Sequence, residues 1–414
     1  MSRRLRGAVG VLLLAAALPA CRGHRPEEPS VLLIGVDGAD MGIADRLIAQ
    51  GKLPSFSRLK REGASGRLRS IEPLLSPIVW TTIATGREPQ DHGIFDFIEI
   101  GKDGQPTPIT SLRRKVPALW NVATQFRVSS GFIGWYASYP AEKVDGFEVS
   151  DRLAFHQVSS ARATAGATYP ESLESDLYRR IGAPAPDLAA TKARFVADPS
   201  APLTPDGAKR LEELARIRAT TEFYRKVVID LQKREHPALL GVYFEMVDAC
   251  GHLFMEDGPP RRGDVSDADF AAFHDTVDRC YEYQDEVLGD LLRLEGSRTL
   301  TIVVSDHGFK SGDLRPRTSG RADTGLAPLW HQLYGVVFLH GRGVPPGREI
   351  DGASVLDVAP TVFASLRIPL SRELPGRPLP AAFPAAAPPA KGVAAYAASP
   401  PRTLPAGASS DAEA

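Results

Sequence analysis

The stretch Val31-Leu32-Leu33-Ile34-Gly35-Val36-Asp37-Gly38 decides the fold of this chain. Its apolar run is continuous rather than alternating, as expected for a strand that is covered on both faces. Similar runs follow at Gly131 to Tyr136, Leu239 to Val247, Leu300 to Val304 and Tyr334 to Leu339. Helical patterns lie between the runs, and this alternation predicts an α/β fold with a doubly wound, mostly parallel sheet.

Two longer segments carry the helical patterns. Residues 267–292 place one stripe at helical spacing, made of Phe273, Val277, Cys280, Tyr281, Gln284, Leu288 and Leu291. The stretch from His156 to Glu235 interrupts the alternation of strands and helices and becomes strongly charged after Asp206. We interpret it as a helical insertion, or cap, above the sheet; an ordinary pair of crossover helices is the alternative.

The composition excludes some classes of protein. The chain has 414 residues, with 49 Lys or Arg against 50 Asp or Glu. This balance argues against a nucleic-acid scaffold, because phosphate binding needs a surplus of basic residues. Residues 381–414 contain 14 Ala and 6 Pro, which predicts a disordered tail and leaves residues 31–380 as the folded domain.

The N-terminus has the layout of an export signal. Arginines precede an uncharged apolar run, Gly7 to Ala20, which is too short to span a membrane. We predict a signal peptide over residues 1–20, lipidation of Cys21 because Leu18-Pro19-Ala20-Cys21 resembles a bacterial lipobox, and a linker over residues 21–30. The protein would then be anchored to the outer membrane, on its periplasmic or surface side. Simple cleavage near Ala20 is the alternative, and would leave a soluble periplasmic protein.

Carboxylates and imidazoles follow three of the predicted strands. Asp37 follows the first, Asp248 and His252 the third, and Asp306 and His307 the fourth. A single Asp after a strand is more often a turn former, but parallel strands bring all three carboxylates to one sheet edge. There they would repel one another and raise each other's pKa values unless a cation were bound. Oxygen and imidazole ligands together favour zinc or manganese over calcium.

Local spacing supports a shared site. Asp248 and His252 are four residues apart, so one helical turn would aim both at the same ion. A second feature is the helix predicted from Ser76-Pro77 to Gly86. Ser76 occupies the predicted N-cap position, where it either caps the helix or meets a phosphate at the positive end of the helix dipole.

With these motifs the chain resembles the alkaline phosphatase superfamily. It is most similar to the type I phosphodiesterase and nucleotide pyrophosphatase branch and to bacterial predicted phosphohydrolases and phosphomutases. The resemblance runs from Val31 to Leu379 and rests on Gly35 to Gly38, Leu53-Pro54, Arg61 to Ala64, Ser76 to Gly86, His92 to Ile94, Asp248 to His252, Ser305 to Gly308, His331 to Gly341 and Leu356 to Thr361. It implies a sheet of the alkaline-phosphatase type.

The resemblance also implies two divalent ions, zinc first and manganese second. One would be held by Asp248, His252 and His331, the other by Asp37, Ser76, Asp306 and His307. His331 is chosen over His340 because it stands shortly before a Gly-bearing strand, as in the family; His340 remains the alternative. The implied mechanism is in-line attack by Ser76 on a phosphoryl group, with a covalent phosphoserine that is then hydrolysed.

Three departures from related patterns narrow the function. The nucleotide pyrophosphatases have Thr at the position of Ser76, and an Asn that holds a phosphate oxygen is replaced here by Phe97. The sulfatase signature is missing, since Pro77 directly follows Ser76 and Trp80 fills the position of its Arg. The phosphoglycerate mutases of the superfamily are cytosolic and longer, which does not suit an exported chain.

The resulting hypothesis is a metal-dependent hydrolase of phosphate esters, diesters rather than monoesters, that acts on a small phosphorylated substrate. The alternatives are a phospho-group transferase acting on envelope lipids or glycans, and an inactive surface-binding lipoprotein. Cys250 and Cys280 are either paired or free. The sequence does not indicate which oligomeric state the protein has.

Overall fold

A computed structural model describes residues 30–101, 104–154, 165–318, 320, 325–383, 392–400 and 402–404. The predictions of a signal peptide, of a lipidated Cys21 and of a linker up to residue 29 lie outside these ranges. Within them, no helix is both long and apolar enough to cross a lipid bilayer.

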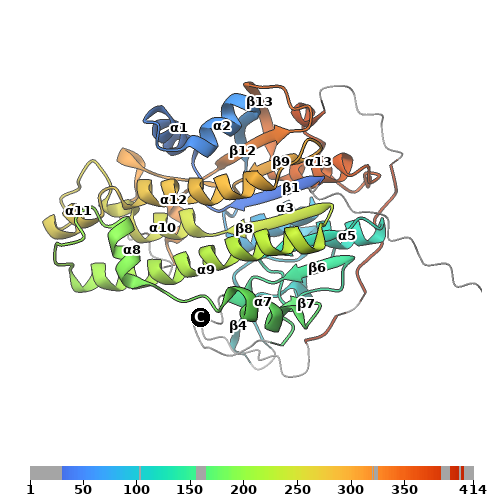
Figure 1. Ribbon diagram of the computed structural model, residues 1–414, viewed down its shortest axis with the longest axis horizontal. Coiled ribbons are helices and arrows are strands. Elements are labelled where there is room, and N and C mark those ends of the chain that lie inside the picture. The colour runs from blue at the N-terminus through green and yellow to red at the C-terminus, as the bar shows by residue number, and fades with distance from the viewer. Residues whose placement is uncertain are drawn as a thin grey trace, which may run out of the picture.

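One large sheet organises the described chain (Figure 1). Its nine strands, in spatial order, are β13 (Arg348–Ser354), β2 (Ala64–Arg69), β12 (Tyr334–Gly341), β9 (Leu300–Val304), β1 (Val31–Val36), β8 (Leu239–Phe244), β5 (Ser130–Ile133), β6 (Gly146–Val149) and β7 (Thr168–Tyr169). The predicted fold class is therefore confirmed: the sheet is mostly parallel, and strands and helices alternate along the chain.

Two strands run against the rest. β12 pairs antiparallel with β9 and β2, and β7 pairs antiparallel with β6. The prediction that residues 334–339 form a parallel strand is therefore wrong. After β9 the chain stays at the carboxyl edge of the sheet, so its next strand must run back. Strand β2, with Arg67 and Arg69 exposed, and strands β6, β7 and β13 were not predicted.

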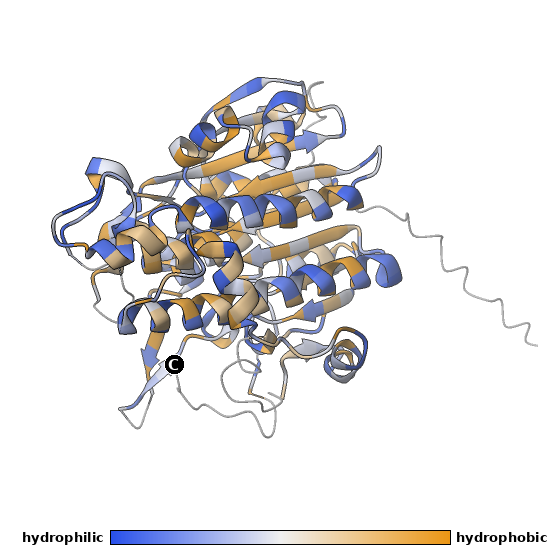
Figure 2. Cartoon of the chain, turned by 60° about the vertical axis from the view of Figure 1, so that its left-hand side comes forward, coloured by the Kyte–Doolittle hydropathy of each residue, from blue (hydrophilic) through white to orange (hydrophobic). Residues whose placement is uncertain are grey.

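Helices cover both faces of the sheet. The helices are α1 (Met41–Ala49), α2 (Pro54–Glu62), α3 (Ser76–Thr85), α4 (Pro89–His92), α5 (Leu119–Gln125), α7 (Leu173–Ile181), α8 (Leu188–Phe195), α9 (Pro205–Glu235), α10 (Met246–Phe254), α11 (Asp267–Phe273), α12 (Thr276–Leu291) and α13 (Val358–Ser365). Leu32, Ile34 and Val36 of β1 face the core on the side of α9, α10 and α12, whereas Val31 and Leu33 face α3, α5 and α13. This explains the uninterrupted apolar run, and Figure 2 shows the hydrophobic strands between helices whose outer sides are hydrophilic.

The two longer helical segments differ from their predicted form. The predicted helix over residues 267–292 is divided into α11 and α12, and all members of its predicted stripe are buried. The stretch 156–235 is helical from Leu173 onward, with residues 155–164 outside the described ranges. Its long helix α9 lies against β8 and β5 on one face of the sheet (Figure 1), which is the place of a crossover helix, the alternative interpretation.

The predicted disordered tail is partly ordered. Residues 392–400 and 402–404 contact the body: Val393 pairs with Ser371, and the Tyr396 hydroxyl donates to the carbonyl of Pro369. Arg402 forms a 3.0 Å ion pair with Glu142. Composition misses these contacts because they depend on one backbone bridge at Val393 and on two side chains, Tyr396 and Arg402, that each have a specific partner on the body.

Candidate functional site

Three adjacent strands bring the predicted carboxylates together. β9, β1 and β8 are neighbours in the sheet, and their carboxyl ends carry Asp306, Asp37 and Asp248 in that order. The backbone N–H of Asp37 donates to the carbonyl of Phe244, which extends the ladder by one step and fixes the carboxylate at the edge. The convergence that the sequence predicted at this edge is thus present.

Helix α10 begins directly after β8 and carries two of the site residues. β8 ends at Phe244 rather than at Val247 as predicted, and Asp248 lies in the first turn of the helix, with His252 one turn later. Gly38 gives the close approach that the site needs: its φ is +68°, and an added Cβ would lie 2.7 Å from the Cα of Asp248. Another side chain at this position would push the two strand ends apart.

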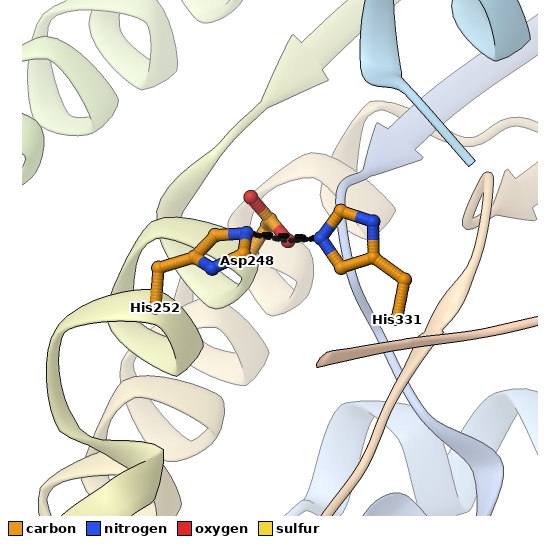
Figure 3. Close-up of side chains that lie close together, drawn as sticks. All are labelled: Asp248, His252 and His331. Atoms are coloured by element: carbon orange, nitrogen blue, oxygen red, sulfur yellow. Dashed lines mark hydrogen bonds and ion pairs between the residues drawn. The ribbon is translucent and has the colours of Figure 1, made fainter. Parts of the chain in front are cut away.

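One group of side chains converges on Asp248 (Figure 3). The Nε2 atoms of His252 and His331 lie 3.4 Å and 3.5 Å from Asp248 Oδ1, and 2.9 Å from each other. His331 comes from β11 (His331–Gln332), which pairs with β10 (Gly308–Phe309). This is the first predicted ligand set, and the structure assembles it completely.

A second group surrounds His307. Its Nε2 atom lies 3.5 Å from Asp37 Oδ1, 3.5 Å from Asp306 Oδ2 and 3.7 Å from Asp248 Oδ1. The rings of His307 and His331 stack with centroids 3.6 Å apart, so the two groups contact each other through these rings. Asp248 is therefore within reach of both groups, a closer arrangement than the two separate sets predicted.

Backbone carbonyls orient all three imidazoles. In His252, Nδ1 lies 2.7 Å from the carbonyl oxygen of Gly320. In His331 the corresponding distance is 2.8 Å, to the carbonyl oxygen of Leu74, and in His307 it is 3.1 Å, to that of Gly308. We assign the ring proton to Nδ1 in each case, which leaves the Nε2 lone pair for the site. Such carbonyl contacts are the usual support of a metal-binding histidine.

The donor atoms fit a divalent cation. Asp37 Oδ1, Asp248 Oδ1, Asp306 Oδ2 and His307 Nε2 are buried and make no hydrogen bond within the described chain. Buried polar atoms of this kind are normally partnered. Ligands about 2.0 Å from a tetrahedral zinc ion lie about 3.3 Å apart, close to the 2.9–3.7 Å separations found here. Two groups of three residues have ligand atoms close enough to share one ion: Asp248, His252 and His331, and Asp37, Asp248 and His307.

The pKa shifts of these residues also favour a bound cation. Burial raises the pKa of Asp37, and the charge of Asp248 raises it further. Burial and the charge of Asp37 likewise raise the pKa of Asp306 well above its ordinary value. Burial and the neighbouring His307 lower the pKa of His331 to about 3, which keeps its imidazole neutral. Burial also raises the pKa of Asp248, but its contacts with His252, His331 and His307 together lower it below its ordinary value. A bound cation would stabilise the charged forms of Asp37 and Asp306.

Ser76 stands in the chain between two residues that contact this cluster, Leu74, whose carbonyl faces His331, and Trp80, whose Nε1 donates to Asp37. It is the first residue of α3, buried to 5% exposure, while Leu75 takes the N-cap position; the prediction that Ser76 itself is the N-cap is wrong. The carbonyl of Leu74, two residues earlier, is the one that orients His331. The amides of Ile78 and Val79 both donate to Leu75, and Pro77 has no N–H. The first turn thus offers an anion few free amides, so positive charge must come from elsewhere.

Two further residues at the site were not predicted. Trp80 Nε1 donates to Asp37 Oδ2 at 3.0 Å, and the Tyr243 hydroxyl donates to the same oxygen at 2.6 Å. Together they leave only Oδ1 of Asp37 to face His307. A single sequence marks both aromatics as core residues; the signal is only that Tyr243 stands next to last in β8, near the carboxyl edge.

The alternative ligand His340 is far from the cluster. It lies near the end of β12, which runs antiparallel to β9, so it sits by Thr301 near the amino edge of the sheet. Its Nδ1 is 2.9 Å from Glu295 Oε1. Because β12 runs antiparallel to β9, His340 lies at the opposite edge of the sheet from His331 and the cluster.

A disulfide fixes the ligand-bearing helix. Cys250, between Asp248 and His252 on α10, is bonded to Cys280 on α12. The choice between a disulfide and free thiols, which the sequence left open, is settled in favour of the bond.

The fold and the site define a hydrolase of the alkaline phosphatase superfamily. A family model described as type I phosphodiesterase / nucleotide pyrophosphatase matches residues 31–320, and the chain belongs to that family. Its membership makes the protein a phosphoric ester hydrolase. No curated protein sequence matches the chain.

Solved structures support the fold. The alkaline phosphatase PafA superposes with a TM-score of 0.53 at 13% identity, covering 86% of this chain and 99% of that one. A 2-O GAG sulfatase superposes with a TM-score of 0.54 at 12% identity, covering 87% of this chain and 75% of that one. At these identities the likeness concerns the fold alone.

Proposed function

We propose that the protein hydrolyses phosphodiesters with two divalent cations and with Ser76 as the nucleophile. The observation that carries the proposal is the convergence of three carboxylates and three imidazoles at one sheet edge, which helix α3 contacts through Trp80. When bound, the cations would neutralise the carboxylates, activate the serine hydroxyl and stabilise charge on the phosphoryl oxygens. Zinc suits the mixed oxygen and nitrogen donors best, with manganese second.

The protein's own groups then have distinct tasks. Asp248, His252 and His331 would hold one ion, and Asp37, Asp306 and His307 the other, with Asp248 close enough to contact both. Ser76 would attack the phosphorus atom in line with the departing oxygen and become a phosphoserine, which water hydrolyses. Its position at the helix end keeps the backbone fixed during attack.

Charge favours diesters over monoesters. A diester carries one negative charge on its phosphate, whereas an ionised monoester carries two. Asp37 is flanked by Trp80 and Tyr243, whose donors are already used, so these two side chains do not stabilise the extra charge. We therefore expect bis-(p-nitrophenyl) phosphate to be a better substrate than p-nitrophenyl phosphate.

The test uses the full chain with zinc or manganese and these two esters. Ser76→Ala should abolish hydrolysis, while Ser65→Ala, which alters a serine of similar burial on β2, should keep it. Absence of any hydrolysis that depends on Ser76 would overturn the proposal. Adding an alcohol acceptor and analysing the products separates hydrolysis from transfer. Metal analysis of Asp306→Ala against the parent chain tests whether the carboxylates hold the metal. A parent chain that binds metal but hydrolyses neither ester would indicate the inactive binding protein.

A further inference from the structure

A hollow of about 850 Å³ lies at the end of the sheet formed by β13, β2 and β12. Its opposite wall comes from α1, through Met41, Gly42 and Asp45, and from Lys60 of α2. Figure 1 shows these two helices beside β13 at the upper end of the sheet. Sites for small organic molecules measure about 300–1,000 Å³, so the hollow has the size of a ligand site. The catalytic cluster instead occupies β9, β1 and β8 and shares no lining residue with it.

Three arginines in this hollow are without a partner. Arg67 and Arg69 stand two residues apart on β2, so their side chains leave the same face of the strand. Arg348 stands on the neighbouring strand β13. Among the described residues, none of the three guanidinium groups finds a hydrogen bond or an ion pair. By contrast, Lys60 in the same hollow pairs with Asp45 at 2.5 Å.

The hollow carries a net positive charge. Four basic side chains line it against three acidic ones: Lys60, Arg67, Arg69 and Arg348 against Asp45, Glu349 and Asp351. Two guanidinium groups on one strand face repel each other unless an anion lies between them. Arginine presents a planar fork of N–H donors that matches the oxygens of a phosphate group. Arg67 and Arg69 are therefore arranged to hold a phosphate.

The surroundings of Arg69 favour a ligand with an organic part. Across the ladder, Arg69 lies opposite Tyr334 on β12 and Ser354 on β13, whereas Asp351 lies in the bulge opposite Arg67. Tyr334 is 42% exposed, and its ring contacts no other aromatic ring of the described chain. An exposed ring beside a guanidinium group offers a flat apolar surface for a sugar or a base.

The start of α1 does not supply the binding groups. The carboxylate of Asp40 accepts from the amides of Gly42 and Ile43 at 2.8 Å and 3.1 Å, so these N–H groups are used. Burial raises the pKa of Asp40, and the charge of Arg67 is among the effects that oppose this rise. Arg67 thus lies within electrostatic reach of the helix start, and an anion in the hollow would be held by arginine side chains.

We propose that this hollow is a second anion site, which binds a small organic phosphate of nucleotide size. Its phosphate lies between Arg67 and Arg69, and its ring or sugar lies on Tyr334. A bare phosphate ion would leave most of the hollow and the exposed ring unused. The inference goes beyond the proposed function and does not rest on it, because no residue of the catalytic cluster takes part.

Binding is tested on the full-length Ser76→Ala chain after metal has been removed with a chelating resin. Without cations, the carboxylates of the catalytic edge repel phosphate, so binding of an anion reports on another site. By titration calorimetry we expect AMP to bind, and adenosine to bind at least about tenfold more weakly, the factor for one lost charged hydrogen bond. Absence of AMP binding, or equal binding of adenosine, would overturn the inference.

Matched variants locate the site. Arg67→Gln with Arg69→Gln should weaken AMP binding by at least about tenfold. Arg372→Gln with Arg377→Gln removes the same charge from two exposed positions outside the hollow and should leave the affinity within about twofold, since distant exposed charges are screened. Equal losses in both double variants would show an effect of net charge and contradict the site.

The role of the ring is tested separately. Tyr334→Leu should weaken the binding of AMP and leave the affinity for inorganic phosphate unchanged. Equal losses for AMP and inorganic phosphate would contradict the placement of the organic part on this ring. Hydrolysis is measured in none of these titrations, so a failure of the proposed function does not alter their outcome.

Discussion

His252 and His331 face each other through Nε2 atoms that lie 2.9 Å apart, while Nδ1 of each ring lies against a backbone carbonyl. With both protons on Nδ1, two lone pairs would meet at this distance. Burial lowers the pKa of His252, but the charge of Asp248 and the hydrogen bonds to Asp248 and Gly320 together raise it above its ordinary value, so a proton can occupy the gap in the metal-free chain. A divalent cation would replace that proton, which links metal binding to pH and to stability.

Removal of the metal is therefore expected to destabilise the chain in a pH-dependent way. Burial raises the pKa of Asp37 and of Asp306 from 3.8, so in the metal-free chain the stability of their protonated forms is lost as pH rises through the raised pKa values. The difference in melting temperature between metal-loaded and chelated protein should grow as pH rises above 3.8 toward the raised pKa values. Calorimetry at several pH values with EDTA and with zinc checks this. A constant difference would contradict two-cation binding at these carboxylates.

The hydroxyl of Tyr243 is expected to tune metal affinity. Tyr243→Phe keeps the ring but removes one of the two donors to Asp37 Oδ2, so this carboxylate loses part of its orientation. Loss of such a supporting contact typically weakens metal binding about 10- to 100-fold. Competition titration with a chromogenic chelator measures the change. Tyr281→Phe is the control, because its buried hydroxyl accepts from the amide of Asp40 instead; equal losses in both variants would indicate general destabilisation.

Some strands of the fold could be predicted from the sequence and others could not. β1 and β9 were predicted to the residue, because strands buried on both faces have continuous apolar runs. The direction of β12 could not be predicted, because a strand that runs antiparallel in the same sheet has the same composition as a parallel one. β2 was missed because Arg67 and Arg69, exposed on a strand next to the end of the sheet, interrupt its apolar run.

The site was more predictable than its surroundings. Asp37 directly follows β1, and Asp306 follows β9 after one residue, where parallel topology alone brings side chains together. The roles of Trp80 and Tyr243 depend on which face of a buried helix or strand meets a carboxylate, and buried aromatics more often belong to the core. The ordered contacts near the C-terminus were hidden for a related reason, because composition does not reveal the partner of a single side chain such as Arg402.

The disulfide is expected to protect the site as well as the fold. The Cys250–Cys280 bond closes a loop of 30 residues between α10 and α12. Removing a bond of this loop length costs roughly 3–4 kcal/mol of unfolding free energy. In Cys250→Ser with Cys280→Ser we expect lower stability and also weaker zinc binding, since Asp248 and His252 flank Cys250. Urea unfolding and metal titration check the two effects. Unchanged zinc affinity at a temperature where the variant is fully folded would show that α10 is positioned without the bond.

The C-terminal contacts are expected to stabilise the body through a buried charge. Arg402 donates to the carbonyl of Ser111 and pairs with Glu142, a carboxylate that also contacts Arg114 and Trp120. Arg114 and Arg402 hold the pKa of Glu142 below its ordinary value against the effect of burial, so this stability is present at neutral pH and is lost on acidification.

Arg402→Gln should lower the unfolding free energy at pH 7 by roughly 1–3 kcal/mol, the usual cost of losing a charged hydrogen bond to a buried group. Arg377→Gln, at an exposed position in the same part of the chain, should have little effect. Urea unfolding at pH 7 and at pH 4 measures both variants. The deficit of Arg402→Gln should shrink at pH 4, because Glu142 then gains a proton more readily in either chain. A deficit that is equal at both pH values would show that Arg402 acts by packing and its carbonyl contact, and not through the charge of Glu142.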